Sequence, residues 1–128
     1  MKETYSQLDK ESLLQILSDS KYKAIIVKFS ASWCKPCSKI KNTFTNCIQR
    51  MPDNVLVFDL DIDNESIKEL YGKYKSYRMI RGVPAILVYF YNPSRENWYV
   101  PDMVVNSSNI CIITQMFDAV ESKIKTLC

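Results

Sequence analysis

The chain has 128 residues, of which 47% are hydrophobic and 24% are charged, a composition typical of a single globular domain spanning residues 1–128. The net charge of +3 is small and the basic residues are spread along the chain, so we expect no nucleic-acid partner. Histidine is absent, which excludes a Ser-His-Asp triad, a Cys-His protease pair and any zinc site with a histidine ligand.

The start of the chain and its lack of long apolar runs indicate the cellular compartment of the protein. Residues 1–10 are polar, unlike a secretory signal, and no stretch approaches the ~18 consecutive apolar residues of a membrane span. We therefore expect a cytoplasmic protein with no membrane partner. The abundance of lysine, isoleucine, asparagine and tyrosine suggests an AT-rich genome, as in a protozoan or a large DNA virus, and a viral protein could be packaged in the virion.

The first half of the chain alternates helical and extended patterns. A helix over residues 12–20 is expected to start near Asp9 as its cap, and the apolar run 24–30 predicts a strand covered on both faces. Pro36 suits the first turn of a second helix, which ends at Pro52. The apolar positions of that helix are Ile40, Phe44, Cys47, Ile48 and Met51.

The second half continues this alternation. Residues 55–61 predict a strand, the turn at 63–64 leads into a helix, and residues 85–91 predict a third strand. Residues 99–105 predict a fourth strand, antiparallel to the third, which the proline inside it restricts to a sheet edge or a bend. A final helix follows the cap at 107–109. The tyrosines of the middle helix are expected to pack rather than to form a binding surface: Tyr71, Tyr74 and Tyr77.

The element order predicts an α/β fold built on one sheet. The alternating part calls for parallel strands joined by right-handed crossovers, and the late hairpin adds an antiparallel edge. A short additional strand near Tyr5 is expected to precede the first helix.

The close cysteine pair carries the chemistry. Cys34 and Cys37 follow a buried strand and open a helix, where free N–H groups and the helix dipole stabilise a thiolate. Cys34 would attack a substrate disulfide, and Cys37, one turn further and more buried, would resolve the mixed disulfide. Lys35 adds a positive charge that should lower the pKa of Cys34.

A zinc site is the alternative interpretation of this pair. Without histidine, its other ligands would have to come from Cys47, Cys111 and Cys128, none of which forms a second C-x-x-C pair, so we expect no metal. Cys47 is expected to be buried and inert, Cys111 to pack, and Cys128 to be exposed.

A second motif, residues 81–84 (RGVP), stands directly before the third strand. Proline cannot donate to a strand ladder, so Pro84 belongs at the strand start. An ordinary turn proline explains it equally well.

Residues 27–37 (VKFSASWCKPC), the strand ending at 61–63 and residues 81–84 resemble the thioredoxin family, most clearly between residues 22 and 91. The resemblance implies the thioredoxin fold: a central mixed sheet of parallel strands plus an antiparallel C-terminal hairpin, with helices on both faces. It implies that Pro84 is cis and lies against the cysteine pair, and that the backbone of Val83 binds an extended substrate segment. The substrate-binding residues implied are Trp33, Lys35, Pro36, Gly82, Val83 and Pro84.

The resemblance implies an enzyme, a thioredoxin-type protein-disulfide reductase with no cofactor beyond the redox-active Cys34–Cys37 disulfide. Pro36 is what reducing members carry. The expected partners are protein disulfides and an upstream reductase or dithiol donor, and the protein should be a monomer. Two alternatives stay open: a disulfide-forming oxidase or isomerase, favoured by the charge of Lys35, and a binding module that uses its groove to hold a partner.

The sequence also departs from the family. Lys28 replaces a buried aspartate in the strand before the motif, and Asp59 stands where many bacterial members have a lysine. In that alignment the two side chains lie on the same side of neighbouring parallel strands. Our hypothesis is a reversed ion pair beneath Cys37, with Lys28 and Asp59 as catalytic residues and Asp59 as the proton relay. Alternatively, Lys28 extends to solvent and Asp59 is a surface carboxylate.

Further departures of the sequence from the family concern the binding of partner proteins. The segment between residues 63 and 84 is longer than in bacterial members, and residues 92–93 and 98–102 replace a glycine-rich turn and alter the groove region. These changes put docking to a standard thioredoxin reductase in doubt.

Overall fold

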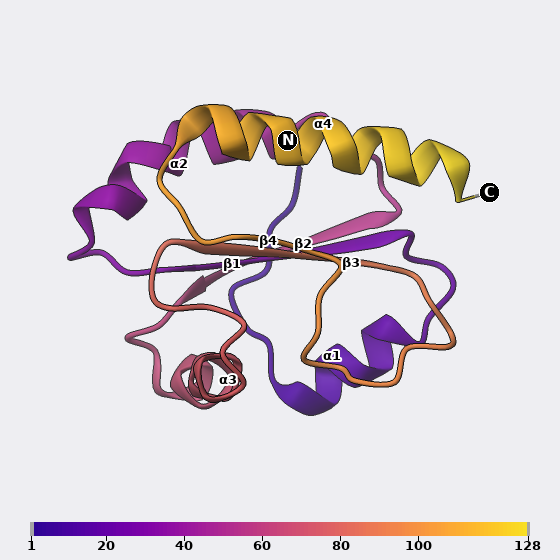
Figure 1. The fold of residues 1–128 in the computed structure, drawn as a ribbon, viewed down its shortest axis with the longest axis horizontal. Coiled ribbons are helices and arrows are strands. Elements are labelled where there is room, and N and C mark those ends of the chain that lie inside the picture. The colour runs from indigo at the N-terminus through magenta and orange to yellow at the C-terminus, as the bar shows by residue number, and fades with distance from the viewer. Residues whose placement is uncertain (1, 128) are drawn as a thin grey trace.

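The computed structural model describes residues 2–127, in which four helices cover the two faces of a four-stranded sheet. Helices α2 and α4 lie on one face, and α1 and α3 lie on the other (Figure 1). The strands are β1 (Ala24–Ser30), β2 (Val55–Asp61), β3 (Ala85–Phe90) and β4 (Met103–Val105), and the helices are α1 (Lys10–Leu17), α2 (Lys35–Ile48), α3 (Glu65–Ser76) and α4 (Ile110–Thr126).

The sheet is mixed and has the strand order β2-β1-β3-β4. β1 is parallel to β2, whereas β3 is antiparallel to both β1 and β4. The parallel arrangement expected of the alternating part therefore holds for β1 and β2 only. The chain after α3 enters the sheet beside the end of β1, where Ala85 pairs with Phe29. This reversal brings the segment before β3 to the end of the sheet at which α2 begins.

Strand alternation gives the sheet a hydrophobic core on each face. Ile25, Val27 and Phe29 of β1 belong to the core beneath α1 and α3, whereas Ala24 and Ile26 belong to the core beneath α2 and α4. The same alternation turns Lys28 toward α2, and its Nζ lies 4.7 Å from the centre of the Phe44 ring. A cation is thus built into an otherwise apolar layer.

Most of the expected elements are present. Asp9 caps α1 by accepting a hydrogen bond from the Ser12 N–H at 2.8 Å, and Asn109 caps α4. The strands over 24–30 and 55–61 have the expected bounds, and α2 ends at Ile48 although Met51 beyond it is still buried.

Two of the expected strands are shorter than the sequence indicated. The fourth covers only Met103–Val105, and near Tyr5 there is a single bridge to Phe58 in place of a strand. Pro101 has no N–H to donate to the ladder, and the side chains of residues 98 and 99 pack instead on the rings of Tyr74 in α3 and of Tyr77, its C-cap. Tyr74 is fully buried as expected, but Tyr77 is 43% exposed and stacks on Tyr99.

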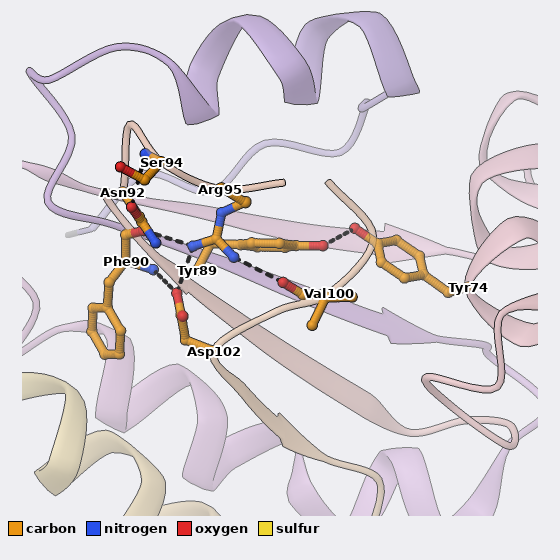
Figure 2. A network of polar contacts seen from close by, with 8 residues as sticks. All are labelled: Tyr74, Tyr89, Phe90, Asn92, Ser94, Arg95, Val100 and Asp102. Carbon is orange, nitrogen blue, oxygen red and sulfur yellow. Dashed lines mark hydrogen bonds and ion pairs between the residues drawn. The ribbon is translucent and has the colours of Figure 1, made fainter. Parts of the chain in front are cut away.

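The connection between β3 and β4 is held by Arg95, as Figure 2 shows. Its guanidinium donates to the carbonyl oxygens of Phe90 and Val100 at 2.9 and 2.8 Å, and to the Asp102 carboxylate at 2.7 Å. The same Asp102 oxygen accepts from the Phe90 N–H at 2.7 Å. A charge-assisted network therefore fixes a connection that has no regular secondary structure.

Candidate active site

The cysteine pair lies at the start of α2. Cys34 is the N-cap residue, its Sγ accepts from the Cys37 N–H at 3.2 Å, and the two cysteines form a disulfide with a Cα–Cα distance of 5.2 Å. The first turn of a helix carries unpaired N–H groups and the positive end of the dipole, which stabilise a thiolate on Cys34 in the reduced form. Both cysteines are buried, with exposed fractions of 5% for Cys34 and 4% for Cys37, so their burial differs little.

The residues around the pair are open to solvent. Trp33 is 65% exposed, and its Nε1 donates to Asp63 Oδ1 at 3.2 Å, which holds the ring beside the cysteines. Lys35 and Pro36 are also exposed, and Pro36 occupies the first helical turn, where its missing N–H costs nothing.

The segment before β3 faces Cys34. The Val83–Pro84 peptide is cis, as the resemblance implied, and Pro84 is buried. The Val83 carbonyl oxygen lies 3.8 Å from Cys34 Sγ. Two segments separated by about fifty positions, the cysteine motif and the Gly82–Val83–Pro84 segment, thereby come together at one edge of the molecule.

One residue of this region carries no signal in the sequence. Asn106, directly after β4, makes hydrogen bonds through its side chain to Arg81, Gly82 and Pro84. Only the β3–β4 pairing brings it there, so a register prediction for these two strands would have been needed to find it.

The pair of Lys28 and Asp59 is present as expected. The two residues are register partners on β1 and β2, and Lys28 Nζ lies 3.7 Å from Asp59 Oδ1. The Lys28 side chain is only 4% exposed, so the alternative in which it extends to solvent is wrong, whereas the Asp59 side chain is 40% exposed. The cation of this ion pair is therefore buried, whereas its carboxylate is half-exposed to solvent.

Burial sets the electrostatics of this pair. It lowers the pKa of the Lys28 ammonium from the ordinary value of 10.5, the Asp59 carboxylate opposes that decrease, and the nearby Lys41 adds to it. Asp59 is thus the charge that opposes the loss of the Lys28 proton inside the protein.

Cys37 and the ion pair share one pocket of about 380 Å³, which Lys28, Cys37, Lys41 and Asp59 help to line. This space has room for several water molecules, each of which takes about 30 Å³ in the liquid. Cys37 and the Asp59 carboxylate therefore line one space that water can enter.

The remaining cysteines lie outside this arrangement. Cys47 is buried, as expected, and burial raises the pKa of its thiol. Cys111 is exposed, so the expectation that it packs is wrong: it occupies an outward position in the first turn of α4. Cys128 falls outside residues 2–127. Among those residues, no three Cys, Asp or Glu side chains gather as metal ligands would, and no helix is long and apolar enough to cross a membrane.

Curated relatives of the chain are thioredoxins. It is 34% identical over 79 residues to thioredoxin 3 of Plasmodium falciparum (isolate 3D7), covering 62% of this chain and 39% of that protein. It is 42% identical over 48 residues to the thioredoxin of Ophiophagus hannah, covering 38% of this chain and 45% of that protein. The matched stretches thus span less than half the length of these two relatives.

Solved structures share the fold. The crystal structure of a Plasmodium falciparum thioredoxin superimposes with a TM-score of 0.63 at 29% identity, over 88% of this chain and 84% of that one. The germline-specific thioredoxin Deadhead of Drosophila superimposes with a TM-score of 0.66 at 18% identity, over 93% and 99% of the two chains. The family model described as Thioredoxin matches residues 4–101, most of the chain. The disulfide-forming pair, the mixed sheet and this match lead to one conclusion: the chain belongs to the thioredoxin family.

Proposed function

We propose that this chain is a thiol–disulfide oxidoreductase that reduces protein disulfides. The observation that carries the proposal is the Cys34–Cys37 disulfide at the N-terminus of α2, facing the cis Val83–Pro84 peptide. A reducing compartment suits this activity, and we therefore place the protein in the cytoplasm.

The proposed reaction has two exchanges. The Cys34 thiolate attacks one sulfur of the substrate disulfide, which breaks that S–S bond, forms a mixed disulfide and releases the other substrate sulfur as a thiolate that takes up a proton. Cys37 loses its proton and attacks Cys34 Sγ, which releases the second substrate thiolate and closes the Cys34–Cys37 disulfide. Two electrons pass to the substrate, and an upstream reductase or dithiol donor returns them.

Substrate binding is assigned to the surface beside Cys34. Within residues 2–127 the Val83 N–H has no hydrogen-bond partner, which leaves it free to pair with an extended segment of a substrate protein. The exposed Trp33 ring and Pro36 flank that position, and Lys35 and Gly82 complete the proposed surface.

We assign the proton of Cys37 to Asp59. Its carboxylate is half-exposed, shares a pocket with Cys37 and is paired with Lys28 at 3.7 Å. Asp59 can therefore accept the Cys37 proton through water as Cys37 attacks, and Lys28 stabilises the thiolate that forms. In Asp59→Asn the resolving step should lose its dependence on the ionisation of this carboxylate, and an unaltered rate–pH profile would exclude the relay.

The test of the main proposal is reduction of insulin disulfides with dithiothreitol as electron donor. The wild type should accelerate the reaction, and Cys34→Ser should abolish the acceleration because no nucleophile remains. Cys111→Ser is the matched control, since Cys111 is an exposed thiol that is not part of the disulfide, and it should keep full activity. Acceleration that persists in Cys34→Ser would refute the mechanism. A wild type without activity would favour a binding module.

The direction of electron flow has a separate test. Two cations favour the thiolates of the reduced form: Lys28, which lines one pocket with Cys37, and the exposed Lys35 beside Cys34. A stabilised reduced form favours the alternative of a disulfide-forming oxidase. Equilibration of the pair with glutathione gives its potential. A reductase requires a value near that of thioredoxin, about −270 mV, whereas a value near the about −120 mV of a strong oxidant would assign oxidation.

A further inference from the structure

We propose that Asn106 is a positioning residue for the substrate-binding segment Gly82–Pro84. The inference rests on the proposed function, because it concerns how that segment is presented to a substrate. Three hydrogen bonds of one side chain carry it. Asn106 Nδ2 donates to the carbonyl oxygens of Gly82 and Pro84 at 3.0 and 2.8 Å, and its Oδ1 accepts from the Arg81 N–H at 2.6 Å.

The side chain of Asn106 extends the β3–β4 ladder beyond its last backbone pair. Val105 pairs with Ile86, and β4 ends there. The next residue, Asn106, supplies a side-chain amide with N–H donors and a C=O acceptor, the same kinds of group that a backbone offers. One edge of the segment before β3 is thereby paired through a side chain.

This pairing fixes which way Val83 faces. Asn106 Nδ2 holds the carbonyl groups on either side of Val83, those of Gly82 and Pro84, and it makes no hydrogen bond to Val83 itself within residues 2–127. The Val83 oxygen lies 3.8 Å from Cys34 Sγ. Asn106 thus keeps the unpaired edge of Val83 directed toward the cysteine at which the substrate must arrive.

The hydrogen bonds of Asn106 are better suited to orienting the segment Gly82–Pro84 than to stabilising the fold. Asn106 is exposed, and its hydrogen bonds to Arg81 and Gly82 are exposed as well, so water can solvate these two groups when the side chain is lost, whereas the bond to Pro84 is part-buried. Removing it should therefore loosen the segment at a small cost in stability. The effect should appear in substrates that pair with Val83 and not in the chemistry of Cys34.

The experiment compares two disulfides. Insulin offers an extended protein segment, whereas 5,5′-dithiobis(2-nitrobenzoate) is a small disulfide that needs only Cys34. Asn106→Asp keeps the acceptor for Arg81 but loses both donors, and Asn106→Ala loses all three bonds. Asn46→Asp introduces the same charge at an exposed position of α2 whose side chain makes no hydrogen bond within residues 2–127.

We expect both Asn106 variants to raise KM for insulin about tenfold, because the binding edge is no longer held in place. Their kcat, and their rate with the small disulfide, should stay within about twofold of the wild type, as should every parameter of Asn46→Asp. In the free protein, amide hydrogen exchange at Arg81 should accelerate in Asn106→Ala and not in Asn106→Asp.

The outcomes separate the two proposals. An unchanged KM for insulin in both variants would overturn the role of Asn106 while leaving the reductase intact. Equal losses with both disulfides would also overturn it, since Asn106 would then act on Cys34 or on the fold. A wild type that does not reduce insulin would remove the proposed function, and with it this inference.

Discussion

Lys28 and Asp59 face each other across β1 and β2, but only Lys28 is withdrawn from water. Removing the two partners should therefore have unequal costs. Asp59→Asn leaves a buried ammonium without its carboxylate, and we expect the free energy of unfolding to fall by about 2 kcal/mol. Lys28→Met leaves a carboxylate that water can solvate, so its change should stay within about 1 kcal/mol. Urea denaturation at pH 7 measures both, and an equal or larger loss in Lys28→Met would contradict this assignment.

The same lysine makes stability depend on pH. Its pKa in the folded protein lies below the ordinary value of 10.5, mainly because of burial. Between these two pKa values the unfolded chain binds more protons than the folded one, so the contribution of Lys28 to the free energy of unfolding rises with pH until it levels off near 10.5. Lys28→Met should lack this rise. The difference between wild-type and variant unfolding free energies, measured from pH 7 to pH 10.5, should therefore increase with pH, and a flat or falling difference would show that Lys28 is not desolvated.

Among the elements, the β3–β4 connection depends on a single cation. Arg95 is 12% exposed and donates to three acceptors from two nitrogens, which one ammonium group cannot reproduce. We expect Arg95→Lys to lower the free energy of unfolding by about 2 kcal/mol. The matched control is Arg50→Lys, because Arg50 is 45% exposed and pairs with Asp118 and Glu121 on the surface. Arg50→Lys should lower the free energy of unfolding by less than about 1 kcal/mol. If urea denaturation showed the same loss of unfolding free energy in Arg95→Lys and Arg50→Lys, the network of Arg95 would add nothing to stability.

Elements with a local signal were predictable from the sequence. The apolar runs of β1 and β2 and the cap at Asp9 lie within a few residues of the structure they specify. Lys28 and Asp59 were also predictable as a pair, because the alignment with the thioredoxin family placed them on the same side of neighbouring parallel strands, and they are register partners in the structure. The cysteine pair needs no tertiary information, since both residues lie in one helical turn.

The remaining features depend on contacts between distant segments. The fourth strand is short because residues near Trp98 pack against α3, and the reversal of β3 depends on where the chain leaves that helix. Arg95 and Asn106 bind backbone carbonyls, and such acceptors occur at every position, so no residue pattern announces them. The exposure of Cys111 likewise follows from the rotation of α4 on the sheet, which helical spacing alone does not fix.

At the scale of the molecule, the sheet offers little free edge to a second copy. Beside β2, the Tyr5 N–H donates to the Val57 carbonyl at 3.0 Å and the Asp59 N–H donates to the Tyr5 carbonyl at 2.9 Å, which pairs part of that edge. The other edge, β4, has three residues. Short or covered edges do not support edge-to-edge pairing of sheets. These features support the expectation of a monomer.

Light scattering coupled to size-exclusion chromatography tests this expectation. With dithiothreitol present, the mass should stay at 14.9 kDa up to about 100 μM, because the sheet edges within residues 2–127 are short or partly covered. The reductant matters because the exposed Cys111 thiol could otherwise join two chains covalently, and Cys111→Ser tests that route under oxidising conditions. A dimer that persists in dithiothreitol would contradict the prediction. If Val104→Lys then restored the monomer, the exposed side of β4 would be its interface, since Val104 is 39% exposed and a lysine there would disfavour pairing.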